Sequence, residues 1–263
     1  GATIEVDESE IAQLLDDEGN NLLTITTQDI TVNDSDTISV NTANSLTDTT
    51  SGVVTATIDP TTTIATLATL DADEGDTNNL TITIREADKT STTAEQLNTV
   101  SAATSLGVNL TNLEALAAST VDDLQDLFTA MDDGGFTNFS AIATIAVSGA
   151  TVDGTDVLAL IDNFDTLNGE NTTAFSLASE ATIQIDADEV SSLLANETAN
   201  RLTIDDQDIE VNSAATISVA SANLLDAVTE GTITASITTS ETVDTLKTLT
   251  GTHAYTIVIA DGD

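Results

Sequence analysis

The sequence predicts an α/β repeat protein, in which short strands alternate with short helices and stack as a right-handed α/β solenoid. Three observations lead to this fold class. The chain repeats itself, its apolar residues recur at helical spacing, and alternating β-branched runs separate the helical segments. The alternative is a series of tandem Ig-like β-sandwich modules. The segment TVDDLQDLFTAM at 120–131 argues against sandwiches, because its apolar period is close to that of a helix.

The repeat is the strongest signal. Residues 2–70 align without a gap with residues 181–249, and roughly half of the aligned positions are identical. Shorter helical motifs recur between the two copies, so we predict three segments: a first repeat unit at 1–90, a diverged middle unit with insertions at 91–180, and a partial second copy at 181–263.

The predicted helices begin with Thr, Ser or Asp, whose side chains can accept hydrogen bonds from the first free N–H groups. One motif, Thr-Ile/Val-x-x-Leu-x-x-Leu, occurs at 63–70, 120–127 and 242–249. A second motif, Thr/Ser-Ala-x-x-Leu, occurs at 42–46, 93–97 and 221–225. Between them lie runs that predict strands with Thr on the solvent side. These runs are TIEV (3–6), LTITTQDITV (23–32), TISV (37–40), VVTATI (53–58), LTITI (80–84), ATIAV (143–147), TIQI (182–185), RLTI (201–204), TITASI (232–237) and YTIVI (255–259).

The charge balance is extreme. Four Lys and Arg residues face 45 Asp and Glu residues, which gives a formal charge of −41. Such a surface repels itself unless ions screen it, and at roughly 0.5 M salt the Debye length is only about 4 Å. The charge excludes nucleic acid as a partner, because there is no basic patch to pair with phosphates. No apolar run approaches the ~18 residues of a membrane span, so we expect no membrane insertion.

Acidic turns are the candidate metal sites. In DADEGDTNN at 71–79, Asp71, Asp73, Asp76 and Asn78 have the alternating spacing of oxygen ligands for Ca²⁺. Asp132 and Asp133, after the matching helix of the middle segment, form a weaker candidate. No Glu closes the first loop at the twelfth position, and the corresponding stretch of the last copy, TGTH at 250–253, has no carboxylate. A solvated turn therefore remains the alternative to a calcium site.

Catalytic constellations are not evident, and we expect the chain not to be an enzyme. The sole histidine, His253, lacks the Ser, Cys or further His partners of known mechanisms, so we expect a turn or packing role for it. The pairs Gln28-Asp29 and Gln207-Asp208 stand at matched positions in the two copies. We expect these polar residues to form a repeating hydrogen-bond ladder between coils rather than a binding site.

The motifs TISV-x-x-AN-x-L, G-x-Val/Ile-TA-Ser/Thr-I and Thr-Ile/Val-x-x-Leu-x-x-Leu, together with the acidic turns, resemble the Thr/Asp-rich repeats of giant type I-secreted bacterial surface proteins and exoproteins. The style is that of RTX adhesins and of marine cyanobacterial proteins. The resemblance covers essentially the whole chain. It implies export, Ca²⁺-assisted folding outside the cell, and a role as adhesin, sheath, filament or surface-layer material. The Gly-Gly-x-Gly-x-Asp nonapeptide of that secretion class is absent, which weakens the calcium part.

These observations together predict a non-enzymatic, extracellular or cell-surface segment that acts as an acidic structural or adhesive element. Counter-ions or Ca²⁺ would stabilise it, and its partners would be neighbouring repeats or identical subunits. The alternative function is a soluble binding domain or enzyme of a halophile, whose acidity is an adaptation to salt. The chain opens at GATIEV without an initiator Met, so we expect it to be a segment of a longer protein.

Overall fold

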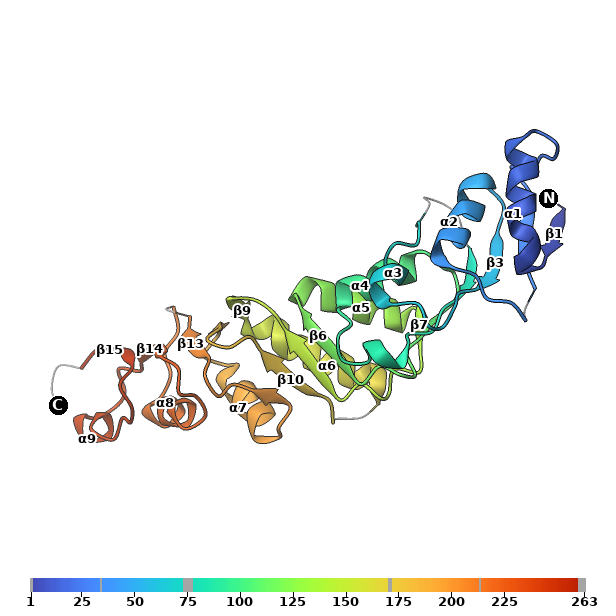
Figure 1. The fold of residues 1–263 in the computed structure, drawn as a ribbon. Helices are drawn as coiled ribbons and strands as arrows, with labels where there is room; N and C mark the ends of the chain where they lie inside the picture. The colour runs from blue at the N-terminus through green and yellow to red at the C-terminus, as the bar shows by residue number, and fades with distance from the viewer. Residues whose placement is uncertain (1, 34, 73–77, 170–171, 213, 260–263) are drawn as a thin grey trace. The chain divides into compact units, whose positions relative to one another are not determined.

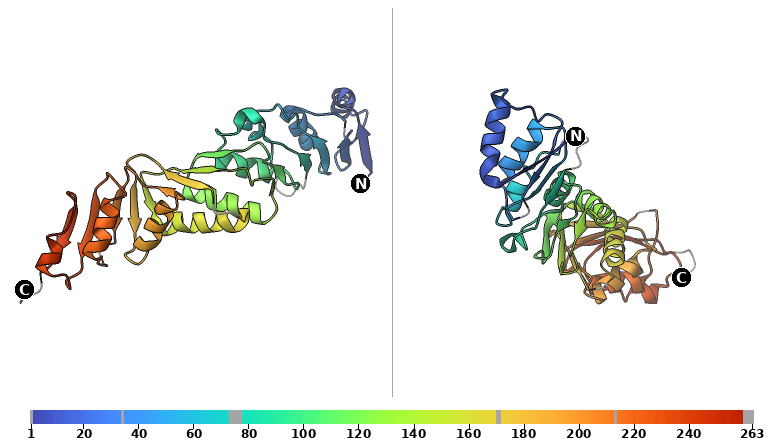
Figure 2. Two further views of the ribbon diagram at one scale, coloured as in Figure 1. Left: turned by 90° about the horizontal axis from the view of Figure 1, so that it is seen from below. Right: turned by 90° about the vertical axis from the view of Figure 1, so that its right-hand side faces the viewer.

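The computed structural model describes residues 2–33, 35–72, 78–169, 172–212 and 214–259. Their contacts divide the chain into two compact units, one of residues 1–117 and 125–142, the other of residues 118–124 and 143–263. The division passes through strand β6 and helix α5. The colours of Figures 1 and 2 run from blue to green along unit 1 and from green to red along unit 2.

Unit 1 alternates short strands with helices. Its elements are β1 (Thr3–Val6), α1 (Glu8–Gly19), β2 (Asp29–Val32), α2 (Val40–Thr49), β3 (Val54–Thr57), α3 (Ile64–Leu67), β4 (Asn79–Thr81), the 3₁₀-helix η1 (Glu86–Asp88), α4 (Ala94–Ala102), β5 (Val108–Asn109), the start of β6 (Ala115–Ser119), the end of α5 (Val121–Asp132) and β7 (Phe136–Thr137). Strands β1, β2, β3 and β4 form a sheet in chain order, and β5 pairs with β7. Figure 2 shows α1 and α2 side by side along this sheet.

Unit 2 follows the same scheme, with two strands before each of its first helices. Its elements are β8 (Thr144–Val147), β9 (Thr151–Asp153), α6 (Gly154–Asn168), β10 (Ala174–Leu177), β11 (Thr182–Ile185), α7 (Val190–Thr198), β12 (Leu202–Thr203), β13 (Asp208–Val211), α8 (Val219–Asp226), β14 (Ile233–Ile237), α9 (Val243–Leu246) and β15 (Ala254–Ile257). One sheet has the order β9-β11-β13-β14-β15, and a second contains β8, β10 and β12. Helices α7 and α8 contact each other and lie on one side of these strands (Figure 1).

The strand pairings within each unit are parallel in the part of the chain that the structure describes. Thr3 pairs with Asp29 and Ile30 with Val54 in unit 1. The equivalent positions of unit 2 pair in the same register. Parallel neighbours need a crossover connection, and a helix supplies most of these connections. The predicted α/β class with alternating short strands and helices is confirmed, and antiparallel Ig-like sandwiches do not fit these sheets.

The two copies of the repeat have the same structure. Strands β1 and β11, β2 and β13, and helices α3 and α9 occupy identical positions in the alignment of residues 2–70 with 181–249. The helix caps recur as well. The hydroxyl oxygens of Thr63, Thr120 and Thr242 each accept a hydrogen bond from the N–H group three residues later, as the shared motif predicts.

The predicted strand at 37–40 is wrong. TISV at 37–40 and its counterpart at 216–219 contribute only isolated bridges, Ile38 to Ile58 and Ile217 to Ile237. The helix begins within each segment, because Ser39 and Ser218 cap the N–H groups of Thr42 and Ser221. The Ile and Val residues of these segments are buried, and the serine between them ends the extended chain. The long run at 23–32 is likewise a strand only from Asp29 onward.

The core consists of small aliphatic side chains, as the composition predicts. Most strands bury alternate residues and most helices bury one stripe, whereas α9 and β15 have no fully buried residue. In α2 the buried stripe includes Val40, Ala43 and Leu46. The aromatic contacts include the edge-on packing of Phe164 against Phe175, whose ring centroids are 6.4 Å apart. Shallow apolar layers of this kind can stabilise a fold in which each strand and helix packs on the next.

Candidate functional site

A polar ladder joins successive strands at equivalent places in both copies. Asp29 Oδ1 accepts a hydrogen bond from the Val53 N–H at 3.0 Å, and Asp208 Oδ1 accepts one from the Thr232 N–H at 2.6 Å. The carbonyl oxygen of Gln28 accepts from the Thr50 hydroxyl. The same bond in unit 2 joins Gln207 to Thr229. The predicted structural ladder is confirmed at Asp29 and Asp208, whose side chains make these bonds, whereas Gln28 and Gln207 contribute their backbone carbonyl oxygens.

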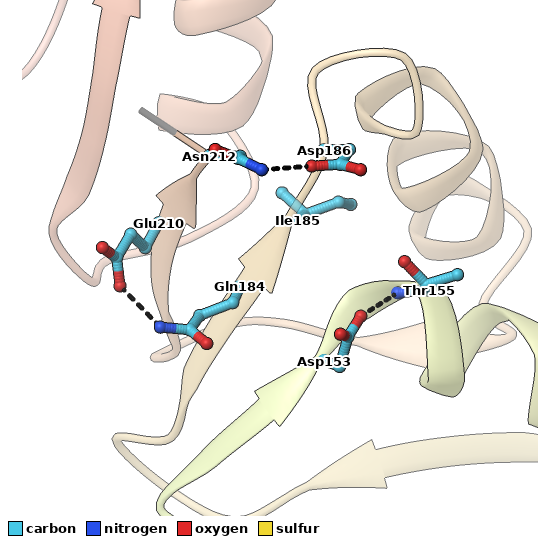
Figure 3. Close-up of a pocket in the computed structure, with 7 residues that line it drawn as sticks. All are labelled: Asp153, Thr155, Gln184, Ile185, Asp186, Glu210 and Asn212. Atoms are coloured by element: carbon cyan, nitrogen blue, oxygen red, sulfur yellow. Dashed lines mark hydrogen bonds between the residues drawn. The ribbon is translucent and has the colours of Figure 1, made fainter. Parts of the chain in front are cut away.

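Strand ends of unit 2 surround an acidic hollow of about 380 Å³ (Figure 3). Asp153, Gln184 and Glu210 stand side by side on β9, β11 and β13. The Gln184 amide donates to Glu210 at 3.0 Å, and the Asn212 amide donates to Asp186 at 2.9 Å. Each amide therefore stands beside a carboxylate and offsets the repulsion that two opposed carboxylates would cause.

The first copy has the same hollow in unit 1, about 340 Å³ in volume, at the ends of β1 and β2. There the Asn33 amide donates to Asp7 at 3.1 Å, as Asn212 does to Asp186. In open α/β sheets the carboxyl ends of the strands are the usual place for ligands. Among the described residues, those that line the two hollows include carboxylates and no cationic side chain, so these surfaces attract cations and repel anions.

Two of the four residues of the predicted calcium loop, Asp71 and Asn78, are described by the structure. Asp73 and Asp76 lie outside the described residues. Asp71 is exposed, and its N–H donates to Asn44 Oδ1. Asn78 is 2% exposed, and its Oδ1 accepts from the Val54 N–H at 2.9 Å. Calcium binding by these four residues stays a prediction. The side-chain oxygen of Asn78 is already hydrogen-bonded to the backbone of strand β3.

The weaker candidate pair, Asp132 and Asp133, lies at the exposed C-terminal end of α5. Within the described ranges, no group of three or more His, Cys, Asp or Glu side chains is placed to hold a metal ion. Over the same ranges, no helix is long and apolar enough to cross a bilayer.

His253 has a structural role that the sequence predicted only in general terms. Its Nδ1 lies 3.2 Å from the Ile233 N–H and accepts from it, and its Nε2 lies 2.6 Å from Asp226 Oδ1. Because Nδ1 accepts, the proton of the neutral ring is on Nε2 and is donated to Asp226. Both ring nitrogens are therefore engaged in holding β15 against β14 and α8.

In the first copy, uncharged side chains make the equivalent hydrogen bonds to the neighbouring strand and helix. Asn78 precedes β4 as His253 precedes β15, and it accepts from Val54, the counterpart of Ile233. Its amide group faces the Thr47 hydroxyl, which stands where Asp226 does in the second copy. Sequence reasoning missed this equivalence because the loops before the two residues differ in length.

We expect the Asp226–His253 pair to make the last strand sensitive to acid. Bonds from Thr250 and then His253 lower the Asp226 pKa from its ordinary value of 3.8, although burial opposes the shift. A carboxyl whose folded-state pKa is depressed stabilises the fold above its unfolded pKa, and that stabilisation is lost as the pH falls through the folded value.

The matched variant transplants the first copy's residues, as Asp226→Thr with His253→Asn. We expect its stability in urea to fall less than that of the wild type between neutral pH and pH ~3. Hydrogen exchange of the β15 amides, followed over the same range, locates the effect. Identical acid dependence in the two proteins would show that Asp226 and His253 are not its source.

Parallel sheets, repeated registers and acidic strand ends define the chain as an acidic α/β repeat. Comparison with known protein families, curated proteins and solved structures finds no match.

Proposed function

We propose that the chain is a non-enzymatic structural or adhesive repeat segment of an extracellular bacterial surface or filament protein. Its coils stack as a right-handed α/β solenoid, and counter-ions or Ca²⁺ neutralise carboxylates that otherwise push the coils apart. Its partners are neighbouring repeats or identical subunits. The proposal rests on the internal repetition and on the acidic surface.

The observation that best supports a stacked architecture is the register of the strands. Within each unit a strand pairs with its equivalent in the next coil, and side-chain bonds join the same coils at separations of 24 to 29 residues. Each coil thus buries its aliphatic face on its neighbours and satisfies its polar groups there, as solenoid repeats do.

The chemistry of the strand ends supports the role of cations. Carboxylates line equivalent hollows in both copies, and the chain carries a formal charge of −41. In such a protein, self-repulsion opposes the compact state at low ionic strength. The halophile alternative explains the same acidity by monovalent salt alone, so the two proposals differ in their response to Ca²⁺.

We expect Ca²⁺ to raise the melting temperature at both ~0.01 M and ~1 M NaCl, where the Debye lengths are ~30 Å and ~3 Å. A specific site binds the folded state even when monovalent ions screen the surface, and it adds about 3 kcal/mol of stability at a Ca²⁺ concentration a hundred times its Kd. Calorimetry in Ca²⁺, in Mg²⁺ and in EDTA separates specific binding from screening. Equal melting temperatures in Ca²⁺ and EDTA at both salt levels would refute the calcium hypothesis and favour the halophile alternative.

A further inference from the structure

An apolar groove runs between α7 and α8 of unit 2. It has a volume of about 510 Å³, and the residues that line it include Leu194, Ala195, Ala199, Leu224, Ala227 and Val228. Leu224 is 57% exposed. This large apolar side chain lies on the surface of a molecule that has 45 acidic residues. An exposed apolar surface of this kind, on an otherwise charged molecule, indicates a contact site.

The first copy shows that the fold does not require this apolar surface. Helices α1 and α2 form the equivalent pair in unit 1 and contact each other as α7 and α8 do. Where the groove has Ala195, Leu224, Ala227 and Val228, the first copy has the polar residues Asp16, Ser45, Asp48 and Thr49.

Acidic residues border the groove on one side. An adjoining hollow of about 640 Å³ shares Ala227 and Val228 with the groove, and its lining includes Asp205, Asp206 and Glu230. The counterparts of these three acids in the first copy are Thr26, Thr27 and Ser51. Compared with the first copy, the second copy therefore has fewer carboxylates on the helix face and more along the border of that face. The result is an apolar groove with an acidic margin.

We propose that the groove between α7 and α8 docks a cationic amphipathic α-helix of a partner protein. Two parallel helix faces accept apolar side chains at i, i+3/i+4 and i+7 of a third helix. Lys and Arg on the flank of that helix would lie against Asp205, Asp206 and Glu230. Charge complementarity selects this occupant over a second copy of the chain, which would bring a further formal charge of −41. The proposal does not depend on the proposed structural function.

The probe is a synthetic Leu/Lys peptide of about 18 residues, long enough to form a helix, with its Leu residues on one face. A second peptide with the same composition in scrambled order controls for charge. Titration calorimetry measures the binding of each peptide. It is carried out at ~0.5 M NaCl, because salt at this concentration screens diffuse attraction to the acidic surface. We expect the amphipathic peptide to bind at a single site and to slow hydrogen exchange in α7 and α8, and the scrambled peptide to do neither.

The test variant restores the first copy's residues, as Leu224→Ser with Ala227→Asp. We expect it to fold, because Ser45 and Asp48 occupy these positions in α2, and to bind the amphipathic peptide at least about tenfold more weakly. The variant Ala195→Asp, also taken from the first copy, checks the opposite wall of the groove and should weaken binding in the same direction. The matched control is Leu22→Ser, which removes a side chain that is 76% exposed outside the groove and should leave the affinity unchanged.

Two results would overturn the proposal. Equal affinity of the wild type and both groove variants would show that the peptide binds the acidic surface diffusely. Concentration-dependent dimerisation of the wild type that Leu224→Ser with Ala227→Asp abolishes, without specific peptide binding, would assign the groove to a second copy of the chain.

Discussion

Replacing Asp165 by Ala is expected to lower the free energy of unfolding of unit 2 by about 3–5 kcal/mol. Asp165 near the end of α6 accepts from both terminal nitrogens of the Arg201 guanidinium, and one of these bonds measures 2.8 Å. The Nε of Arg201 donates to the carbonyl oxygen of Thr173 at 2.7 Å. Arg201 is only 6% exposed, so loss of the carboxylate leaves a buried charge without its counter-ion.

Urea denaturation followed by circular dichroism measures this effect. The control is Asp244→Ala, which removes the partner of Lys247 in an exposed pair whose side chains are 93% and 68% accessible. Surface pairs of that kind contribute about 0–1 kcal/mol. If Asp165→Ala costs no more than Asp244→Ala, the buried pair does not stabilise the unit.

Gly231→Ala is the second substitution with a large expected effect, and Gly52→Ala is its counterpart in unit 1. A Cβ at either position would lie 2.2 Å from a backbone carbonyl oxygen, that of Gln207 or Gln28 respectively. This is well inside the ~3.5 Å of van der Waals contact, and the obstacle is main chain that cannot rotate away. We expect each substitution to cost about 1–3 kcal/mol or more, and to disturb the pairing of the strand that follows.

Gly19→Ala provides the matched control, since a Cβ there has no neighbour within 4 Å and the residue ends a helix. It should be neutral or stabilise the protein by up to about 1 kcal/mol. The two deleterious variants should give similar losses, because the Thr hydroxyl two residues earlier accepts from the glycine N–H at 2.9 Å in both copies. A loss in only one of them would show that the two turns are not energetically equivalent.

Much of the local structure could be predicted from the sequence. The alignment of the two copies identified equivalent strands, and the repeated Thr of the helical motif identified caps that the structure confirms at Thr63, Thr120 and Thr242. Such signals are local, because a cap or an alternating strand depends on residues within a few positions of one another. The exception at 37–40 arose where a serine cap competed with β-branched neighbours.

The candidate sites were harder to predict. Asn78 was assigned to a calcium loop because of its spacing from Asp71, whereas the structure buries it and places its oxygen on the Val54 N–H. The sequence also does not indicate that His253 makes the same hydrogen bond in the second copy as Asn78 makes in the first. The groove at Leu224 could have been found by asking where the two copies differ in polarity rather than where they agree.

The sequence by itself determined the repeat, the alternation of helix and strand, the aliphatic core and the excess of negative charge. These depend on composition and on periodicity along the chain. Only the tertiary structure decided that the strands within each unit pair in parallel, that amides stand beside carboxylates at Gln184 and Asn212, and that Asp165 meets Arg201. The physical reason is distance along the chain. These partners are 26 to 36 residues apart, and one further coil must fold before they meet.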